Sequence, residues 1–271
     1  MILMSEDRHN YPNTLSFGEH LEELRKTLFS ILAVISVFAI AIFCFKDWTF
    51  RMLLAPSKWD FVTYRYIEKF LHWLGSSFCF SEYHVNLIAT ELSSQFMTHV
   101  TATFYLGLLA ASPYIIYELF RFVTPALYEK ERKYSVRIAI IMYVLFIVGV
   151  LMSYFILFPI AFRFLGTYSV SDIVESNITL RSYIGTFTSL TLIMGLVFQL
   201  PVIAFFPGKI GAVKSDFLKK YRKHALVIIM VVAAIITPPD LMTLILVTIP
   251  LYLLFEVSIG ILKRMEKKKP V

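Results

Sequence analysis

Four long stretches without a charged residue place the strongest constraint on how this chain can fold. Residues 27–45, 92–117, 138–162 and 182–208 contain no Lys, Arg, Asp or Glu, and the shortest of them has 19 residues. About 20 residues of α-helix, rising about 1.5 Å each, cross the roughly 30 Å hydrocarbon core of a bilayer. Hydrophobic residues make up 58% of the chain and charged residues only 17%, which is more apolar surface than one soluble core can bury. We therefore expect an all-α membrane protein.

The last third of the chain predicts two shorter helices. Residues 225–237 are apolar but number only 13, and Pro238 and Pro239 follow them directly. Because prolines end a helix, we expect a short hairpin here that thins the membrane locally or leaves a step filled by partners. The complete prediction is a concave six-span bundle over residues 27–262, with spans at about 27–45, 92–120, 138–162, 182–206, 225–237 and 241–262.

The distribution of Lys and Arg predicts the orientation of these spans. Of the 26 basic residues, 19 lie in alternate polar segments and 7 lie in the segments between them. The positive-inside rule then places both termini in the cytoplasm. The cytoplasmic side receives an amphipathic N-terminal helix at 1–26, loops at 121–137 and 207–224, and a basic tail at 263–271, while residues 46–91 form an extracytoplasmic cap.

The cap has a composition typical of a folded structural element. Basic and acidic residues are mixed in it, and its aromatic side chains suit a helix or loop that rests among lipid headgroups. These aromatic residues are Trp48, Trp59, Tyr64, Tyr66 and Trp73. A structural role is favoured over a binding role.

Composition also argues against several other classes of protein. The net charge of +7 comes from short clusters between apolar runs, so no nucleic-acid-binding face is expected. Cys44 and Cys79 have neither a metal-ligand spacing nor a disulfide framework, and no metal or cofactor is expected. The first apolar run follows a polar stretch and precedes no small-residue cleavage site, so we expect it to stay in the mature protein.

An acidic cluster lies directly before the first span. Ser16 and Glu19 form a capping-box pattern, and apolar residues follow at helical spacing, which predicts an interfacial helix. Its other face has Glu22 and Glu23. For Glu19 and Glu22 we favour a role limited to the helix cap and dipole.

Four motifs in a fixed order resemble the TatC family. They are HLEELRK at 20–26, FVTPALYEKER at 122–132, YFILFPIAF at 154–162 and TPPD at 237–240. TatC is the multispanning core subunit of the twin-arginine protein translocase. With the six-span layout, the resemblance covers nearly the whole chain except a cap region at about 57–90, which is longer than in many members.

The resemblance implies a site for a twin-arginine signal peptide. Family members use two carboxylates for the paired arginines, and these map onto Glu23 and Glu131. A carboxylate matches a guanidinium because the two can form a bidentate, charge-assisted pair that Lys cannot reproduce. Without the family match, Glu131 would be interpreted as a solvated acid paired with Lys130 or Arg132. The remaining implied site residues are Phe122 and Leu127, for apolar or backbone contacts, and Arg25 and Arg132, which would orient the acids.

Three polar residues are expected at membrane depth. Many family members have Glu at the position of Gln199, and Gln keeps the hydrogen-bonding capacity but loses any proton role. Gln199 could still bind a polar group of a partner helix. Glu118 and Glu256 are costly at this depth and are expected to face a cavity, a partner or the interface. Residues expected to shape the helices and turns are Pro56, Pro113, Pro125, Pro159, Pro238, Pro239 and Asp240.

These patterns predict a receptor and scaffold with no catalytic activity of its own. The resemblance implies that its partners are signal peptides of folded substrates, single-span TatA- or TatB-type subunits, lipid and other copies of the chain. It also implies a place in the bacterial inner membrane and transport driven by the proton-motive force. The alternative is a small-solute transporter, which bent helices and intramembrane acids favour but the missing internal repeats disfavour. An intramembrane enzyme is disfavoured because no facing catalytic groups lie at depth.

Overall fold

Five helices of the structure are long and apolar enough to cross a membrane, which confirms an all-α, multispan protein. They cover Leu21–Phe43, Ser94–Phe122, Val136–Thr167, Leu180–Gly208 and Leu241–Glu266. The structure is a computed structural model, and it describes residues 17–75, 81–83, 85–123, 135–169, 171, 177–210, 213–237 and 240–267.

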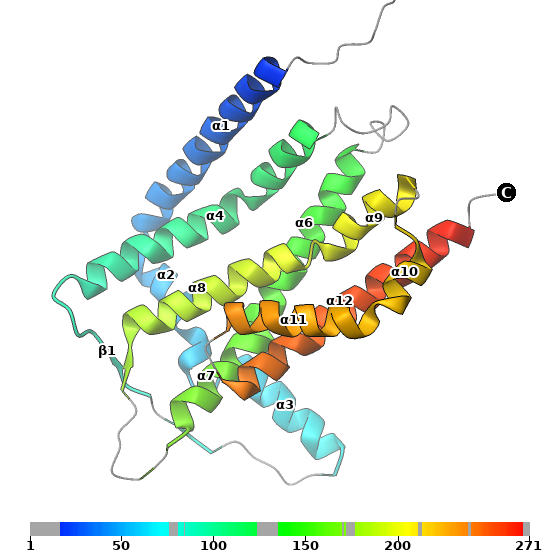
Figure 1. Cartoon of the computed structure of the whole chain (residues 1–271). Helices are drawn as coiled ribbons and strands as arrows, with labels where there is room; N and C mark the ends of the chain where they lie inside the picture. Colours follow the sequence, from blue (N-terminus) through cyan, green and yellow to red (C-terminus); the bar gives the residue numbers. More distant parts are fainter. Residues whose placement is uncertain are drawn as a thin grey trace, which may run out of the picture.

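Within the described residues, the elements follow one another as a series of helices with one short pair of strands, and Figure 1 shows how the helices are arranged. In chain order they are α1 (Phe17–Phe43), α2 (Lys46–Leu53), the 3-10 turn η1 (Ala55–Ser57), α3 (Val62–Trp73), β1 (Leu87–Ile88), α4 (Ser94–Val123), α6 (Ser135–Met152), the π-helical segment η3 (Ser153–Leu157), α7 (Phe158–Thr167), β2 (Ile178–Thr179), α8 (Leu180–Val197), α9 (Leu200–Ile210), α10 (Ser215–Lys220), α11 (Arg222–Ile236) and α12 (Leu241–Lys267).

The secondary structure differs from the sequence prediction in three respects. The expected N-terminal helix and the first span form one continuous helix, α1, because residues 19–43 contain no Gly or Pro. Helix α11 has 15 residues and reaches only about 22 Å, so it is not among the five long helices. Helix α12, which was also expected to be short, has 27 residues and is one of the five long helices, because it continues through Glu256 to Lys267. The two-residue strands β1 and β2 pair in parallel, which a purely helical prediction did not include.

Prolines coincide with irregularities in the long helices. Pro159 follows the π-helical segment η3 as the second residue of α7. Pro201 has the same position in α9, directly after a turn at Phe198 and Gln199. Pro113 and Pro250 lie inside α4 and α12. Each proline removes a backbone donor, which explains why these long helices are interrupted or bent.

Aromatic side chains fill the core where the cap meets the bundle. Phe158 and Phe187 meet edge to face, with ring centroids 4.9 Å apart, and both are almost fully buried. Two buried tyrosines attach separate segments to this core. The Tyr64 hydroxyl donates to the Pro159 carbonyl at 2.7 Å, and the Tyr183 hydroxyl donates to the Leu53 carbonyl at 2.9 Å. The cap is therefore held to the bundle by packing and by satisfied hydroxyls.

Helices α1 and α4 lie side by side along one edge of the bundle (Figure 1). The two helices pack tightly at Gly107, where an added Cβ would lie 2.9 Å from the Cβ of Ala39. Further along, Ala111 is fully buried against Ile31 and Ile35. The α4 residues of this α1–α4 interface recur at 107, 111, 114 and 118, which is the helical spacing for one face.

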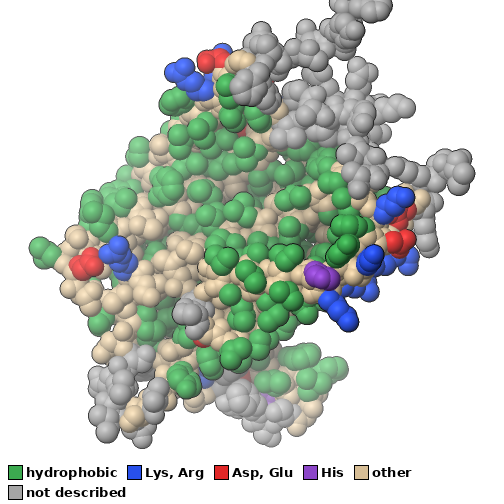
Figure 2. Space-filling view, in the orientation of Figure 1, with side chains coloured by type: hydrophobic (Ala, Val, Ile, Leu, Met, Phe, Trp, Pro, Cys, Tyr) green, Lys and Arg blue, Asp and Glu red, His purple; other side chains and the backbone are tan. Residues whose placement is uncertain are grey.

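The outer surface is suited to lipid. Figure 2 shows hydrophobic side chains over the middle of the molecule, with charged residues gathered towards its ends. Large apolar side chains on the long helices are exposed, including Ile40 at 68% and Leu253 at 59%. In water such a surface would cause aggregation, whereas in a bilayer it is solvated by acyl chains.

Candidate functional site

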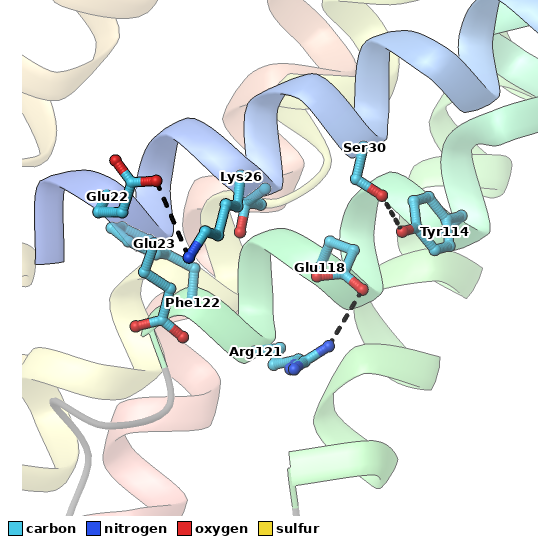
Figure 3. A pocket seen from close by; sticks show the side chains of 9 residues that line it. Glu22, Glu23, Lys26, Ser30, Tyr114, Glu118, Arg121 and Phe122 are labelled. Atoms are coloured by element: carbon cyan, nitrogen blue, oxygen red, sulfur yellow. Dashed lines mark hydrogen bonds and ion pairs between the residues drawn. The ribbon is translucent and has the colours of Figure 1, made fainter. Parts of the chain in front are cut away.

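A cleft of about 650 Å³ opens at the end of the α1–α4 interface, where the first turns of α1 face the last turns of α4 (Figure 3). Where the interface meets the cleft, the hydroxyls of Ser30 and Tyr114 form a hydrogen bond of 2.6 Å. The lining residues come only from these two helices and are Glu22, Glu23, Lys26, Thr27, Ser30, Tyr114, Glu118, Arg121 and Phe122.

Two of the three carboxylates in the cleft already have basic partners. Glu22 lies 3.8 Å from the Lys26 ammonium and 3.7 Å from the Arg25 guanidinium. Glu118 lies 3.4 Å from Arg121, and its side chain is only 12% exposed. These pairs follow helical geometry, because the partners are three or four residues apart.

Glu23 is the remaining carboxylate. It is half-buried, and it makes no hydrogen bond or ion pair with any residue that the structure describes. In Figure 3 its carboxylate points away from Lys26, beside the last turn of α4 near Phe122. The cleft thus offers an acid whose charge is not neutralised by the described part of the chain.

Some of the predicted site residues line the cleft, and others lie outside it or outside the described residues. Glu23 and Phe122 line the same cleft, and Glu118, which was expected to face a cavity, a partner or the membrane–water interface, lies there with them. Arg25, which was expected to orient the acids, pairs with Glu22 and lies 5.7 Å from the Phe29 ring centroid. Predicted residues that fall outside the described residues are Glu131, Arg132, Leu127, Pro125, Pro238 and Pro239.

Sequence reasoning missed Ser30, Tyr114 and Arg121 as parts of the cleft. The signal that could have found Tyr114 is its spacing on the buried face of α4, seven residues after Gly107 and four before Glu118. Arg121 could have been found as the basic residue one helical turn after Glu118.

The other intramembrane polar residues have partners within the chain. The Gln199 side-chain nitrogen donates to the Met142 carbonyl at 3.0 Å, while its buried oxygen has no partner among the described residues. Glu256 accepts from Arg222 at 2.8 Å and from the Tyr252 hydroxyl at 3.1 Å. Glu256 is therefore neutralised inside the hairpin of α11 and α12.

The described structural residues have identifiable contacts. Pro56 is buried in η1, and the Pro159 carbonyl accepts the Tyr64 hydroxyl. The Asp240 carboxylate accepts the Thr243 backbone N–H at 2.7 Å and so caps the start of α12. Among the described residues, no group of three or more His, Cys, Asp or Glu side chains could hold a metal ion.

Comparison with known proteins identifies the family. The family model for the Sec-independent protein translocase protein TatC matches residues 19–250. The TatC of Blattabacterium sp. subsp. Periplaneta americana is 38% identical over 264 residues, covering 96% of this chain and 99% of that protein. The TatCy of Bacillus subtilis is 35% identical over 256 residues, covering 94% of this chain and 92% of that protein.

The fold agrees with a solved structure from the same family. The crystal structure of the twin-arginine translocase receptor TatC superimposes with a TM-score of 0.72 at 29% identity. The match covers 92% of this chain and all of that one. TatC proteins are translocase subunits and not enzymes, so family membership also decides against a solute transporter and an intramembrane enzyme. The chain belongs to the TatC family of Sec-independent protein translocase proteins.

Proposed function

We propose that the cleft between α1 and α4 binds the paired arginines of a twin-arginine signal peptide, with Glu23 as one receptor carboxylate. As a TatC protein, the chain is the receptor subunit of the twin-arginine translocase. The observation that supports the cleft as the site is that Glu23 lines it without a basic partner among the described residues.

An incoming guanidinium would meet favourable electrostatics at Glu23. Glu22 and Glu118 are each paired with a cation three or four residues away, so an Arg must displace an existing partner to reach them. At Glu23 no such exchange is needed. The half-buried position strengthens the pair further, because nearby protein atoms lower the effective dielectric below that of water.

Glu131 is the second carboxylate of this proposal. It belongs to the segment 124–134, which connects α4 to α6, and the end of α4 contributes Phe122 to the cleft. The support for Glu131 is therefore its nearness in sequence to the cleft residue Phe122. Arg132 and Leu127 of the same segment would orient Glu131 and contact the peptide.

The proposed topology has six spans, with the cleft and both termini in the cytoplasm of a bacterial inner membrane. Three facts support it: the excess of Lys and Arg on one set of segments, the bacterial origin of the relatives, and the position of α11 beside α12. With 15 residues, α11 would cross only where the bilayer is thin.

Single-span TatA- or TatB-type subunits, and other copies of the chain, are the proposed partners within the membrane. An apolar groove of about 440 Å³ between α6, α9 and α12 includes Phe198, the neighbour of Gln199. The Gln199 oxygen is buried and accepts no hydrogen bond from the described residues, so a polar group of a partner helix could bind it if the helices around the groove moved apart.

The experiment is binding of a fluorescent Arg-Arg signal peptide to the purified full chain in detergent. Glu23→Gln removes the charge with little change of shape, and we expect affinity to fall roughly 10- to 100-fold, the range for about 1.5–3 kcal/mol of a charged hydrogen bond. Glu22→Gln is the matched control, because it removes an adjacent acid that already has two partners. Equal affinity of the Glu23→Gln variant and the unaltered chain would refute the site.

A further inference from the structure

Helix α3 lies at the opposite end of the bundle from the cleft and has two different faces (Figure 1). One face is attached to the bundle: the Thr63 hydroxyl donates to the Phe155 carbonyl, and the Tyr64 hydroxyl donates to the Pro159 carbonyl. These contacts fix both the position of α3 and its rotation about its axis. The side chains on its other face are therefore displayed in a defined direction.

That second face is a stripe of exposed apolar and aromatic side chains. Val62, Tyr66, Phe70 and Trp73 follow at helical spacing and are 46%, 69%, 59% and 79% exposed. A water-facing helix would not keep its largest side chains exposed in one row. The aromatic stripe, defined by these four residues, needs an apolar neighbour outside the described chain.

The aromatic stripe is continuous with the surface of a membrane span. A groove of about 410 Å³ lies between α3 and two exposed residues of η3, Phe155 and Ile156, within the long helix Val136–Thr167. Its lining is apolar apart from the side chains of Thr63 and Tyr66. Acyl chains that solvate this span would therefore reach α3 without crossing a polar barrier.

Basic side chains follow one edge of the aromatic stripe. The Lys69 ammonium lies 5.9 Å from the Tyr66 ring centroid, and Arg65 lies one turn earlier with its side chain 65% exposed. Among the described residues, Arg65 shares only a surface pair of 3.5 Å with Asp60. Cations beside aromatic rings match the phosphate layer that lies just above the acyl chains.

We propose that α3 is an interfacial anchor that lies in the headgroup layer of the bilayer. Phospholipid is the ligand: its acyl chains contact Tyr66, Phe70 and Trp73, and its phosphates contact Arg65 and Lys69. The anchor holds the cap against the membrane at the end of the bundle away from the cleft. The assignment of α3 to the outer leaflet rests on the topology proposed above, whereas the contact between α3 and lipid does not depend on it.

The test uses the position of Trp73, one of three tryptophans in the chain. Replacing Trp48 and Trp59 with Phe leaves Trp73 as the only tryptophan, which is excited at a wavelength where the 15 tyrosines do not absorb. The full chain is reconstituted in vesicles of phosphatidylcholine and phosphatidylglycerol with bromine at either end of the acyl chains. We expect bromine near the carbonyl end to remove the larger part of the Trp73 emission, bromine near the methyl end to remove less, and aqueous iodide to quench weakly.

A matched control moves the fluorophore to the polar edge of α3. In a variant that also contains Trp73→Phe and His72→Trp, the indole lies about 100° round the helix, because successive residues are separated by that angle. This variant should show more quenching by iodide and less by brominated lipid. The comparison separates insertion of the stripe from simple closeness to the vesicle.

Two outcomes would overturn the proposal. Strong iodide quenching of Trp73 with no response to bromine would place α3 in water. Protection from both quenchers would mean that a protein surface, such as a second copy of the chain, covers the stripe. The Arg-Arg peptide assay on the same preparations reports on Glu23 separately, so failure of the anchor and failure of the signal-peptide site can be told apart.

Discussion

Replacement of Gly107 by Ala should weaken the interface that forms the cleft. A Cβ at this position would lie 2.9 Å from both the Cβ and the backbone N of Ala39 and 3.0 Å from its Cα. Ordinary carbon contacts begin near 3.5 Å, so α1 and α4 must separate by about 0.5–1 Å. Two of the three atoms belong to the backbone, and no change of rotamer can move them aside.

The expected magnitude follows from two opposing effects. Overpacking of this kind costs about 1–3 kcal/mol, whereas Ala in place of Gly in a helix gains up to about 1 kcal/mol. Gly185 in α8 provides the control, because an added Cβ there meets nothing within 4 Å. Gly185→Ala reports the helix gain alone. The free energy of unfolding of Gly107→Ala should therefore be lower than that of Gly185→Ala by about 1–3 kcal/mol.

Unfolding would be followed by helicity in mixed micelles of dodecyl maltoside with increasing sodium dodecyl sulfate. The same samples would be used for Arg-Arg peptide binding, because separation of α1 from α4 moves Glu23 relative to Phe122. We expect Gly107→Ala to bind the peptide more weakly and Gly185→Ala to bind it unchanged. Equal unfolding free energies for the two variants would refute the packing argument.

Two further predictions concern the cap and the hairpin. Burial raises the pKa of Tyr64 above its usual 10.0, so above pH 10 the folded state holds a proton that the unfolded state has lost. Stability should then fall by up to about 1.4 kcal/mol per pH unit, and Tyr64→Phe should show a flatter decline in unfolding free energy measured between pH 9 and 11. In the hairpin, a double-mutant cycle of Arg222→Ala and Glu256→Gln should give a coupling energy of about 1 kcal/mol, because the pair is partly exposed. Additive effects on unfolding would show that the 2.8 Å contact contributes nothing.

The sequence was sufficient for the class of fold because length and apolarity alone decide whether a helix can cross a bilayer. The proline pair at 238–239 indicated correctly that α11 would be short, whereas the same expectation for α12 was wrong, because α12 has 27 residues. The parallel contact between β1 and β2 could not be predicted, because it joins residues about 90 positions apart through only two residues on each side. No periodic pattern exists in so short a strand.

The cleft was predictable only in part. A motif pointed to Glu23, but the partnership of Ser30 with Tyr114 depends on how α1 and α4 pack along each other, 84 residues apart in sequence. That register is determined by the small side chains at the α1–α4 interface, where Gly107 meets Ala39. The helix propensities of individual residues do not encode the register in which two helices pack. The sequence consequently left it open whether Glu118 faces a cavity, a partner or the membrane–water interface, whereas the structure places it with Glu23 in one cleft.

The difference between Glu22 and Glu23 can nevertheless be traced to the sequence. On a helix, a carboxylate pairs best with bases three and four residues later. Arg25 and Lys26 occupy both positions relative to Glu22, and both approach it within 4 Å. Relative to Glu23 those positions hold Lys26, which already contacts Glu22, and the uncharged Thr27. The order of five residues therefore neutralises the first acid and leaves the second for a guanidinium from outside. Exchange of Thr27 for Lys should supply Glu23 with its missing partner and weaken the binding of an Arg-Arg peptide, even though no acid has been removed.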